Sequence, residues 1–198
     1  MKYALIGCGG HAKEVIAQMK TDLICFVEDD YSTTQTKSLN EFDPNEYKVL
    51  ITVADPKTRN KILKKLPKNT KFFTFIHPTA LIMSDDIEIG EGSFIGAYSI
   101  LTSNIKLGKH SLLNRGCQIG HDTVCGDFLS MMPGSIISGN CKLGNRVYLG
   151  TNSSIREKIT ICNDVTIGLN TGVVKDINEK GVYVGSPAKK LIKKCEKI

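Results

Sequence analysis

Residues 101–125 read LTSNIKLGKHSLLNRGCQIGHDTVC, and every sixth residue of this stretch, from Leu101 to Cys125, is apolar. The same six-residue period runs from His77 through Asn178, where it makes seventeen hexads, and sixteen of their seventeen first residues are apolar. A glycine follows the first residue in eight of these hexads. An α-helix repeats about every 3.6 residues and a strand every two, so neither explains a period of six.

A triangular coil explains this period, because each hexad then forms one short strand and one corner. Three hexads complete a turn of 18 residues, and the strands of successive turns pair in parallel about 4.8 Å apart. The first residue of each hexad, from His77 and Met83 to Val173, is expected to point inward. We therefore predict a parallel β-helix over residues 77–180, while the repeat itself leaves the handedness open.

The first 76 residues show a different pattern, in which apolar runs at 3–7, 23–27, 48–53 and 71–76 alternate with helical spacing at 11–20 and 56–66. This alternation indicates a small parallel α/β sheet. The first run leads into Gly7-Cys-Gly-Gly-His-Ala12, which fits the GxGxxG/A pattern of dinucleotide-binding proteins, and Glu28 lies about 20 residues further on. Backbone N–H groups of such a turn can bind phosphate at the start of a helix. This motif leaves three interpretations open: a site for a nucleotide-linked ligand, an NAD-dependent oxidoreductase, or a tight turn without a ligand.

Composition narrows the class of protein. The chain has 198 residues, a net charge of +6 and seven cysteines without a CxxC pair. Its lysines are dispersed and have few aromatic neighbours, which favours small acidic ligands over nucleic acid. No window approaches about 18 apolar residues, and the N-terminus carries no secretion signal. We expect a soluble cytoplasmic protein with reduced thiols, no membrane insertion and no nucleic-acid partner.

Three segments before the hexads carry a resemblance that extends over essentially the whole chain. Residues 7–15 read GCGGHAKEV, residues 53–59 read VADPKTR and residues 75–80 read FIHPTA. This order resembles the sialic acid O-acetyltransferase family of hexapeptide-repeat acyltransferases, which also contains N-acetyltransferases of UDP-4-amino-4,6-dideoxy sugars and GDP-perosamine. The resemblance implies a Rossmann-like α/β domain over 1–76, a left-handed β-helix over 77–180 and a C-terminal segment over 181–198. It also implies a homotrimer with active sites between neighbouring prisms.

The resemblance further implies two binding sites. In the family, the glycine turn and the acids after the second strand hold the nucleotide of the sugar, and the matching residues are Gly9, Gly10, His11, Lys13, Asp29 and Asp30. Acetyl-CoA lies along the later coils, with its phosphates near basic residues toward the C-terminus. The candidates for this second site are Gly139, Gly150, Gly168, Pro187, Ala188 and Lys189. A purely structural role at a corner remains an alternative for each of these glycines.

Residues 113–127, LNRGCQIGHDTVCGD, resemble the catalytic corner of the family. The match assigns His121 as the general base, Asp122 as its acidic neighbour and Asn114 as a contact to the acceptor. A histidine pKa of about 6.5 suits removal of a proton from an amine or hydroxyl that attacks a thioester. Asp122 can orient the ring, and backbone N–H groups or Asn114 can meet the oxyanion. Ser130 stands where several relatives have a second histidine, which puts one acceptor or donor contact in question.

Two other chemistries are less favoured. Cys117 and Cys125 fall on inward positions of the repeat, so they are expected to fill the core rather than to form an acyl-enzyme. A zinc site of the γ-carbonic anhydrase kind needs three histidines, and no histidine follows His121. Residues and resemblance together predict an acetyl-CoA-dependent enzyme without a metal, which N-acetylates a nucleotide-linked 4-amino-4,6-dideoxy sugar in bacterial glycan biosynthesis. O-acetylation of a sialic acid or related sugar, and a non-catalytic β-helix scaffold, remain alternatives.

Overall fold

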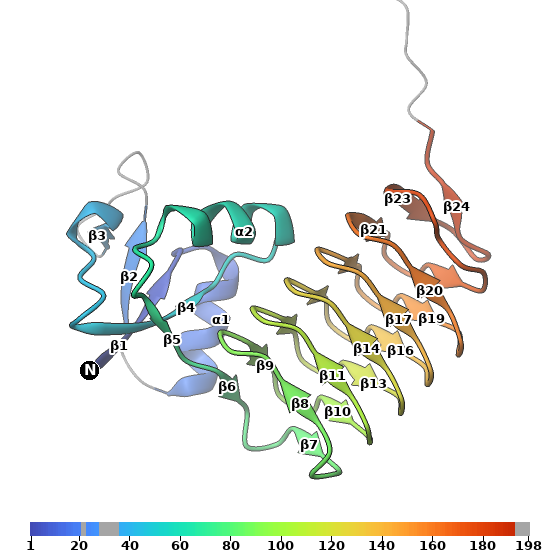
Figure 1. The fold of residues 1–198 in the computed structure, drawn as a ribbon, viewed down its shortest axis with the longest axis horizontal. Helices are drawn as coiled ribbons and strands as arrows, with labels where there is room; N and C mark the ends of the chain where they lie inside the picture. The colour runs from blue at the N-terminus through green and yellow to red at the C-terminus, as the bar shows by residue number, and fades with distance from the viewer. Residues whose placement is uncertain (21–22, 28–35, 193–198) are drawn as a thin grey trace, which may run out of the picture.

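The computed structural model describes residues 1–20, 23–27 and 36–192, which form an α/β domain followed by a parallel β-helix (Figure 1). The acids Glu28, Asp29 and Asp30, which the sequence places after the second strand, lie outside the described residues. None of the helices in the described ranges is long and apolar enough to cross a membrane.

The sheet of the α/β domain has five parallel strands in the described residues, in the order β3-β2-β1-β4-β5. Their bounds are β1 Lys2–Ile6, β2 Ile24–Val27, β3 Lys37–Ser38, β4 Tyr47–Ile51 and β5 Lys71–Phe72. Helix α1 (Gly10–Met19) follows β1, helix α2 (Pro56–Lys65) follows β4, and a 3₁₀ helix covers Leu39–Glu41. Helix α2 begins where it does because the Asp55 side chain accepts a hydrogen bond from the N–H of Thr58 and Pro56 starts the first turn.

The strand expected over residues 71–76 is two strands. Strand β5 pairs with β4 in the α/β sheet, whereas β6 (Phe75–Ile76) pairs with β9 (Phe94–Ile95) in the β-helix. The run is apolar at four of its six positions, so its hydrophobicity does not reveal the break.

The β-helix has three faces, each a sheet of short strands stacked along the prism (Figure 1). Face 1 contains β6, β9, β12 (Leu112–Leu113), β15 (Ser130–Met131), β18 (Tyr148–Leu149), β21 (Val165–Ile167), β23 (Gly181–Val184) and the antiparallel β24 (Lys189–Lys190). Face 2 contains β7 (Leu81–Ile82), β10 (Ile100–Leu101), β13 (Gln118–Ile119), β16 (Ile136–Ile137), β19 (Ser154–Ile155) and β22 (Gly172–Val173). Face 3 contains β8 (Glu88–Ile89), β11 (Lys106–Leu107), β14 (Val124–Cys125), β17 (Lys142–Leu143) and β20 (Thr160–Ile161).

The core of the β-helix is formed by the first residues of the hexads, as predicted from Ile95 to Val173. All of these residues are at most 5 % exposed. The prediction is wrong for the first two hexads, because Ile76 aligns with Ile95 and Ile82 aligns with Leu101, while Met83 is 64 % exposed. Ile89 lies seven positions after Ile82 instead of six, so the period slips by one position there. Leu81, Ile82 and Met83 are all apolar, and the sequence therefore hides which of them points inward.

The fourth residue of each hexad has a left-handed backbone from Gly92 to Asn170. At the non-glycine positions φ lies between 48° and 62°. This conformation costs an ordinary residue about 1–2 kcal/mol, and the coil imposes it at every corner. Residues 18 positions apart consequently stack into columns, three per turn, with the same backbone conformation in each layer.

A buried arginine joins the two domains. Arg59 on α2 is 2 % exposed. Its guanidinium donates hydrogen bonds within its own domain to the carbonyl oxygens of Val53 and Ala54, and to the β-helix at the carbonyl oxygens of His110, Phe128 and Leu129 and the hydroxyl of Ser130. Helix α1 adds a second connection, because Gln18 accepts a hydrogen bond from the N–H of Ala97. These contacts hold the α/β domain against face 1.

Candidate active site

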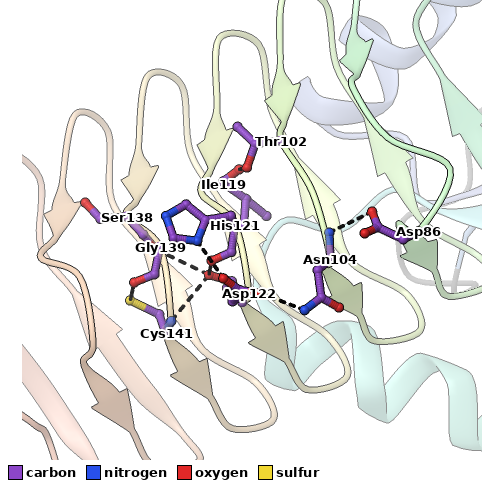
Figure 2. Close-up of polar contacts among 10 residues, drawn as sticks. Asp86, Thr102, Asn104, Ile119, His121, Asp122, Ser138, Gly139 and Cys141 are labelled. Atoms are coloured by element: carbon purple, nitrogen blue, oxygen red, sulfur yellow. Dashed lines mark hydrogen bonds and ion pairs between the residues drawn. The ribbon is translucent and has the colours of Figure 1, made fainter.

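His121 lies at the corner that follows β13, between face 2 and face 3 (Figure 2). Its side chain is 58 % exposed, and Nδ1 lies 2.7 Å from Oδ2 of Asp122. The other oxygen of Asp122 accepts a hydrogen bond of 2.7 Å from Nδ2 of Asn104, one coil earlier in the same column. The contacts with His121 and Asn104 hold the pKa of the Asp122 carboxyl below its usual range.

These contacts determine which ring nitrogen of His121 can act as a base. An ionised carboxylate only accepts hydrogen bonds, so Nδ1 of His121 must carry a proton and donate a hydrogen bond to Asp122. In the neutral ring the lone pair is then on Nε2. Asp122 reaches this position because it has the left-handed conformation of its corner, with φ of 57°. The corner therefore presents Nε2 as a proton acceptor.

Gly139 leaves the space that the His121 ring occupies. It lies 18 residues after His121, in the next coil (Figure 2). A methyl group added to Gly139 would lie 2.7 Å from Nε2 and 2.8 Å from Cε1 of His121. Gly139 is a donor-binding candidate, and its geometry gives it a second role in leaving room for the His121 ring.

Replacing Gly139 with alanine is therefore expected to push the His121 ring out of its place and to lower kcat by about 10- to 100-fold, because small displacements of a reacting group have effects of this size. The exposed ring can turn away, so the melting temperature should change little. Steady-state kinetics and calorimetry on the purified variant check both parts. An unchanged kcat would show that the observed ring position is not needed.

Asn114 lies at a different corner from His121. It follows β12, between face 1 and face 2, and is 5 % exposed. Its Nδ2 donates to Glu14 of α1 at 3.2 Å, and its Oδ1 accepts from the N–H of Arg115 at 2.7 Å. Glu14 also pairs with the Arg115 side chain at 2.9 Å. Within one chain the structure thus couples Asn114 to the α/β domain and does not bring it to the corner of His121.

The glycine turn forms part of a pocket of about 580 Å³ at the carboxyl ends of β1, β2 and β4. The predicted residues Gly9, Gly10 and His11 line this pocket, whereas Lys13 is exposed on α1 outside the lining. The remaining lining is largely apolar and consists of Ile6, Gly7, Cys8, Phe26, Val27, Leu39, Thr52, Val53, Ala54, Thr58 and Ile62. A helix N-terminus at such a sheet edge is a site where backbone N–H groups can hold phosphate.

The side chain of His11, which lines this pocket, is buried, with its ring edge-on to Phe94 at 5.2 Å. Burial lowers its pKa to about 4, so the ring is neutral near pH 7. Its Nδ1 lies 3.6 Å from Glu14, the residue that also contacts Asn114. The sequence alone does not point to Glu14, because its partners in the β-helix are about a hundred positions away.

Ser130 is not at an exposed corner. It is fully buried on face 1, where its hydroxyl donates to the carbonyl oxygen of Ala54 at 2.7 Å and accepts from Arg59 at 2.9 Å. Its role is thus to tie the pocket-lining residue Ala54 to the β-helix. In the sequence, Ser130 stands where several relatives have a second histidine, and that match does not indicate a contact between the two domains.

The donor-binding candidates other than Gly139 have clear packing roles. A methyl group on Gly150 would lie 2.7 Å from the backbone carbon of Gly168, and one on Gly168 would lie 2.8 Å from the Val184 side chain. Pro187 and Lys189 are exposed, and the N–H of Ala188 donates to the carbonyl oxygen of Gly172. These contacts close the last coil. They do not test whether the same residues also bind the donor.

The thiols of the repeat are held in the core. Cys117 and Cys125 are at most 3 % exposed, and burial raises their pKa values to about 11 and about 12. A thiol is nucleophilic as its thiolate, so neither residue suits covalent catalysis. Among the described residues, no three His, Cys, Asp or Glu side chains gather as a metal site would need.

The sequence of the chain is similar to those of known sugar acyltransferases. Residues 2–66 match the PglD N-terminal domain family. The chain is 21 % identical over 175 residues to GDP-perosamine N-acetyltransferase of Escherichia coli O157:H7, covering 79 % of each protein. It is 30 % identical over 112 residues to an acyl-[acyl-carrier-protein]–UDP-N-acetylglucosamine O-acyltransferase of Pseudomonas entomophila, but spans only 43 % of that protein.

Solved structures extend the likeness to the whole chain. The acetyltransferase domain of PglB from Neisseria gonorrhoeae in complex with acetyl coenzyme A is 27 % identical, with a TM-score of 0.82 over 96 % of this chain and 98 % of that one. PerB from Caulobacter crescentus in complex with CoA and GDP-perosamine is 24 % identical, with a TM-score of 0.85 over 96 % and 97 %. The chain therefore resembles the hexapeptide-repeat acyltransferases in fold, with a PglD-type N-terminal domain joined to a left-handed β-helix.

Proposed function

We propose that this enzyme transfers an acetyl group from acetyl-CoA to the amino group of a nucleotide-linked 4-amino-4,6-dideoxy sugar in bacterial glycan biosynthesis. The observation that carries the proposal is the His121–Asp122 pair at an exposed corner, with Nδ1 engaged and Nε2 without a hydrogen-bond partner among the described residues. The GDP-perosamine N-acetyltransferase and the CoA and GDP-perosamine complex of PerB support the substrate class.

In this reaction His121 acts as the general base. Its Nε2 takes a proton from the attacking amine while the new C–N bond forms at the thioester carbonyl. Asp122 stabilises the imidazolium that results, because its carboxylate stays ionised beside Nδ1. The imidazolium then returns the proton to the sulfur of CoA as the C–S bond breaks, so that His121 ends the cycle neutral. Such proton transfer contributes about 10²–10⁴-fold to a rate.

We place the nucleotide in the pocket of the α/β domain. Its volume of about 580 Å³ is in the range of small-molecule sites, about 300–1,000 Å³. The N–H groups at Gly9 and Gly10 would face the phosphates, and neutral His11 would contribute a hydrogen bond without a charge. Lys13, Asp29 and Asp30 remain candidates for the same ligand. Gly139, Gly150, Gly168, Pro187, Ala188 and Lys189 remain candidates for acetyl-CoA.

We also propose that the enzyme works as a homotrimer in the cytoplasm. His121 and Asn114 lie at different corners of one prism. Prisms packed side by side would allow His121 of one copy and Asn114 of another to face one acceptor. A measured molar mass three times that of the chain, by light scattering, would support this assembly, and a monomer with full activity would contradict it.

Mass-spectrometric product detection tests the proposed activity. The enzyme is incubated with acetyl-CoA and UDP-, GDP- or dTDP-linked 4-amino sugars, and separately with free and CMP-linked sialic acid. Addition of one acetyl group to an amino sugar is the expected result. Acetylation of sialic acid alone would move the enzyme to O-acetylation, for which the same base is suitable. No product across the panel would contradict the proposal and favour a scaffold.

Cys8 provides a direct test of the nucleotide pocket. This half-buried thiol lines the pocket, and the half-buried Cys162 in the β-helix serves as an internal control. At about 100 times its dissociation constant, UDP, GDP or dTDP leaves about 1 % of the sites free, so alkylation of Cys8 should slow at least about 10-fold. Peptide mass spectrometry follows both cysteines with iodoacetamide. Equal protection of Cys162, or none of Cys8, would place the nucleotide elsewhere.

A further inference from the structure

Asp86, Asn104 and Asp122 form one corner column, in three successive coils beside His121 (Figure 2). The N–H of Asn104 donates to Oδ1 of Asp86 at 2.7 Å, and its side-chain Nδ2 donates to Oδ1 of Asp122 at 2.7 Å. Asn104 has φ of 48°, the left-handed conformation of its corner. Its side chain thus extends from an anchored backbone toward the next coil.

The contact with Asn104 restricts the Asp122 carboxylate. Because the carboxylate is an acceptor, its partner must be the amide NH₂ of Asn104 and not the amide oxygen. One carboxylate oxygen is then held by Asn104, and the other faces Nδ1 of His121. An exposed aspartate without a second partner could rotate about its side-chain bonds and release the ring. The hydrogen bond at Nδ1 decides which nitrogen of a neutral imidazole carries the proton.

We propose that Asn104 is a positioning residue, which holds Asp122 so that His121 keeps its proton on Nδ1 and its lone pair on Nε2. The role rests on the proposed function, in which Nε2 of His121 takes the proton of the acceptor. Asn104 itself does not contact the reacting atoms. Through Asp122, it increases the fraction of His121 in the reactive tautomer and fixes the direction in which the ring points.

The variant that tests this role is Asn104→Gly. Glycine adopts positive φ readily, so the change removes the amide without straining the corner, and the backbone N–H to Asp86 is retained. Asn152→Gly is the matched control, because Asn152 has the same left-handed conformation, with φ of 55°, at a different corner. Both variants should fold, and both lose one asparagine side chain.

The first measurement is the ¹⁵N NMR spectrum of the ring nitrogens in protein labelled at histidine, which needs no substrate. The chain has four histidines, and the signals of His121 are assigned with His121→Gln. The wild type and Asn152→Gly should show His121 protonated on Nδ1, and Asn104→Gly should show a shift of the proton to Nε2. A wild-type ring protonated on Nε2, or no shift in Asn104→Gly, would overturn the proposal.

The second measurement is the acetyl-transfer rate of the same three proteins. Asn104→Gly should lower kcat by about 10-fold and leave KM for the sugar unchanged, because it changes the base and not the binding pocket. A rise in KM for the sugar with an unchanged kcat would overturn the positioning role. The NMR experiment does not depend on the proposed function. If the tautomer shifts in Asn104→Gly but the protein acetylates no substrate, the role of Asn104 stands and only the proposed activity is rejected.

Discussion

Replacing His121 with glutamine lowers kcat for acetyl transfer by an expected 10²–10⁴-fold, about the range that general base catalysis contributes. Glutamine keeps a polar side chain of similar length but has no group that takes a proton near pH 7. The side chain of His121 is 58 % exposed, so its loss should leave the fold intact. KM for the nucleotide-linked sugar should change little, because the pocket proposed for the nucleotide lies in the other domain.

The matched control for this variant is His77→Gln. His77 lies in the first coil, and its Nδ1 is 2.9 Å from Oγ1 of Thr79. The control should retain the wild-type rate. Product formation is followed by mass spectrometry under saturating acetyl-CoA, which separates kcat from donor affinity. A His121→Gln enzyme with more than about a tenth of the wild-type rate would remove His121 as the base.

Arg59→Met is expected to give the largest loss of stability, about 3 kcal/mol or more. Methionine fills much of the same volume but donates no hydrogen bond. The carbonyl oxygens of Val53, His110 and Phe128 would then lose a donor in the interior, and each unsatisfied group costs about 1–3 kcal/mol. For a chain of this size, about 2–4 °C of melting temperature corresponds to each kcal/mol, so a drop near 10 °C is expected.

Calorimetry of Arg59→Met beside Arg156→Met measures this effect. Arg156 is exposed on the β-helix, so its change removes a charge without opening the domain junction. Arg59 also holds Ala54, which lines the pocket proposed for the nucleotide, and the variant should therefore bind nucleotide more weakly. A melting temperature equal to that of Arg156→Met would mean that the junction does not depend on the buried arginine.

The regular part of the fold follows from the sequence because every coil repeats one environment. From Ile95 to Ile155 each first residue lies between equivalent residues of the coils before and after it, so a single period identifies the core. The first coil has a neighbour on one side only, and the adjacent apolar residues Leu81, Ile82 and Met83 hide its phase. The period thus fails at the end of the prism, where the repeated environment ends.

The site divides in the same way. His121 and Asp122 are neighbours in the chain, so their contact can be expected from the sequence alone. Asn104 lies 18 residues before Asp122, a distance that the coil converts into direct contact, but no local motif marks it. The contacts of Arg59 and Glu14 join segments 51 to 101 positions apart and depend on how two domains dock. Hydrophobic period carries no information on that docking.

The corner columns also determine how a prism of this kind can change in length. A column stays in register only if an insertion adds, or a deletion removes, a complete coil of 18 residues, since every corner must again lie over a corner. A single added residue between Asp122 and Gly139 would turn the glycine away from the His121 ring, because the next coil would no longer lie in register with it. The two departures from the period fall in the first coil, between β7 and β8, and in the last, where β23 pairs with β21 at a spacing of 16 residues. Growth and loss of single residues are therefore confined to the two ends, and the layers around the base can be lengthened only as whole units.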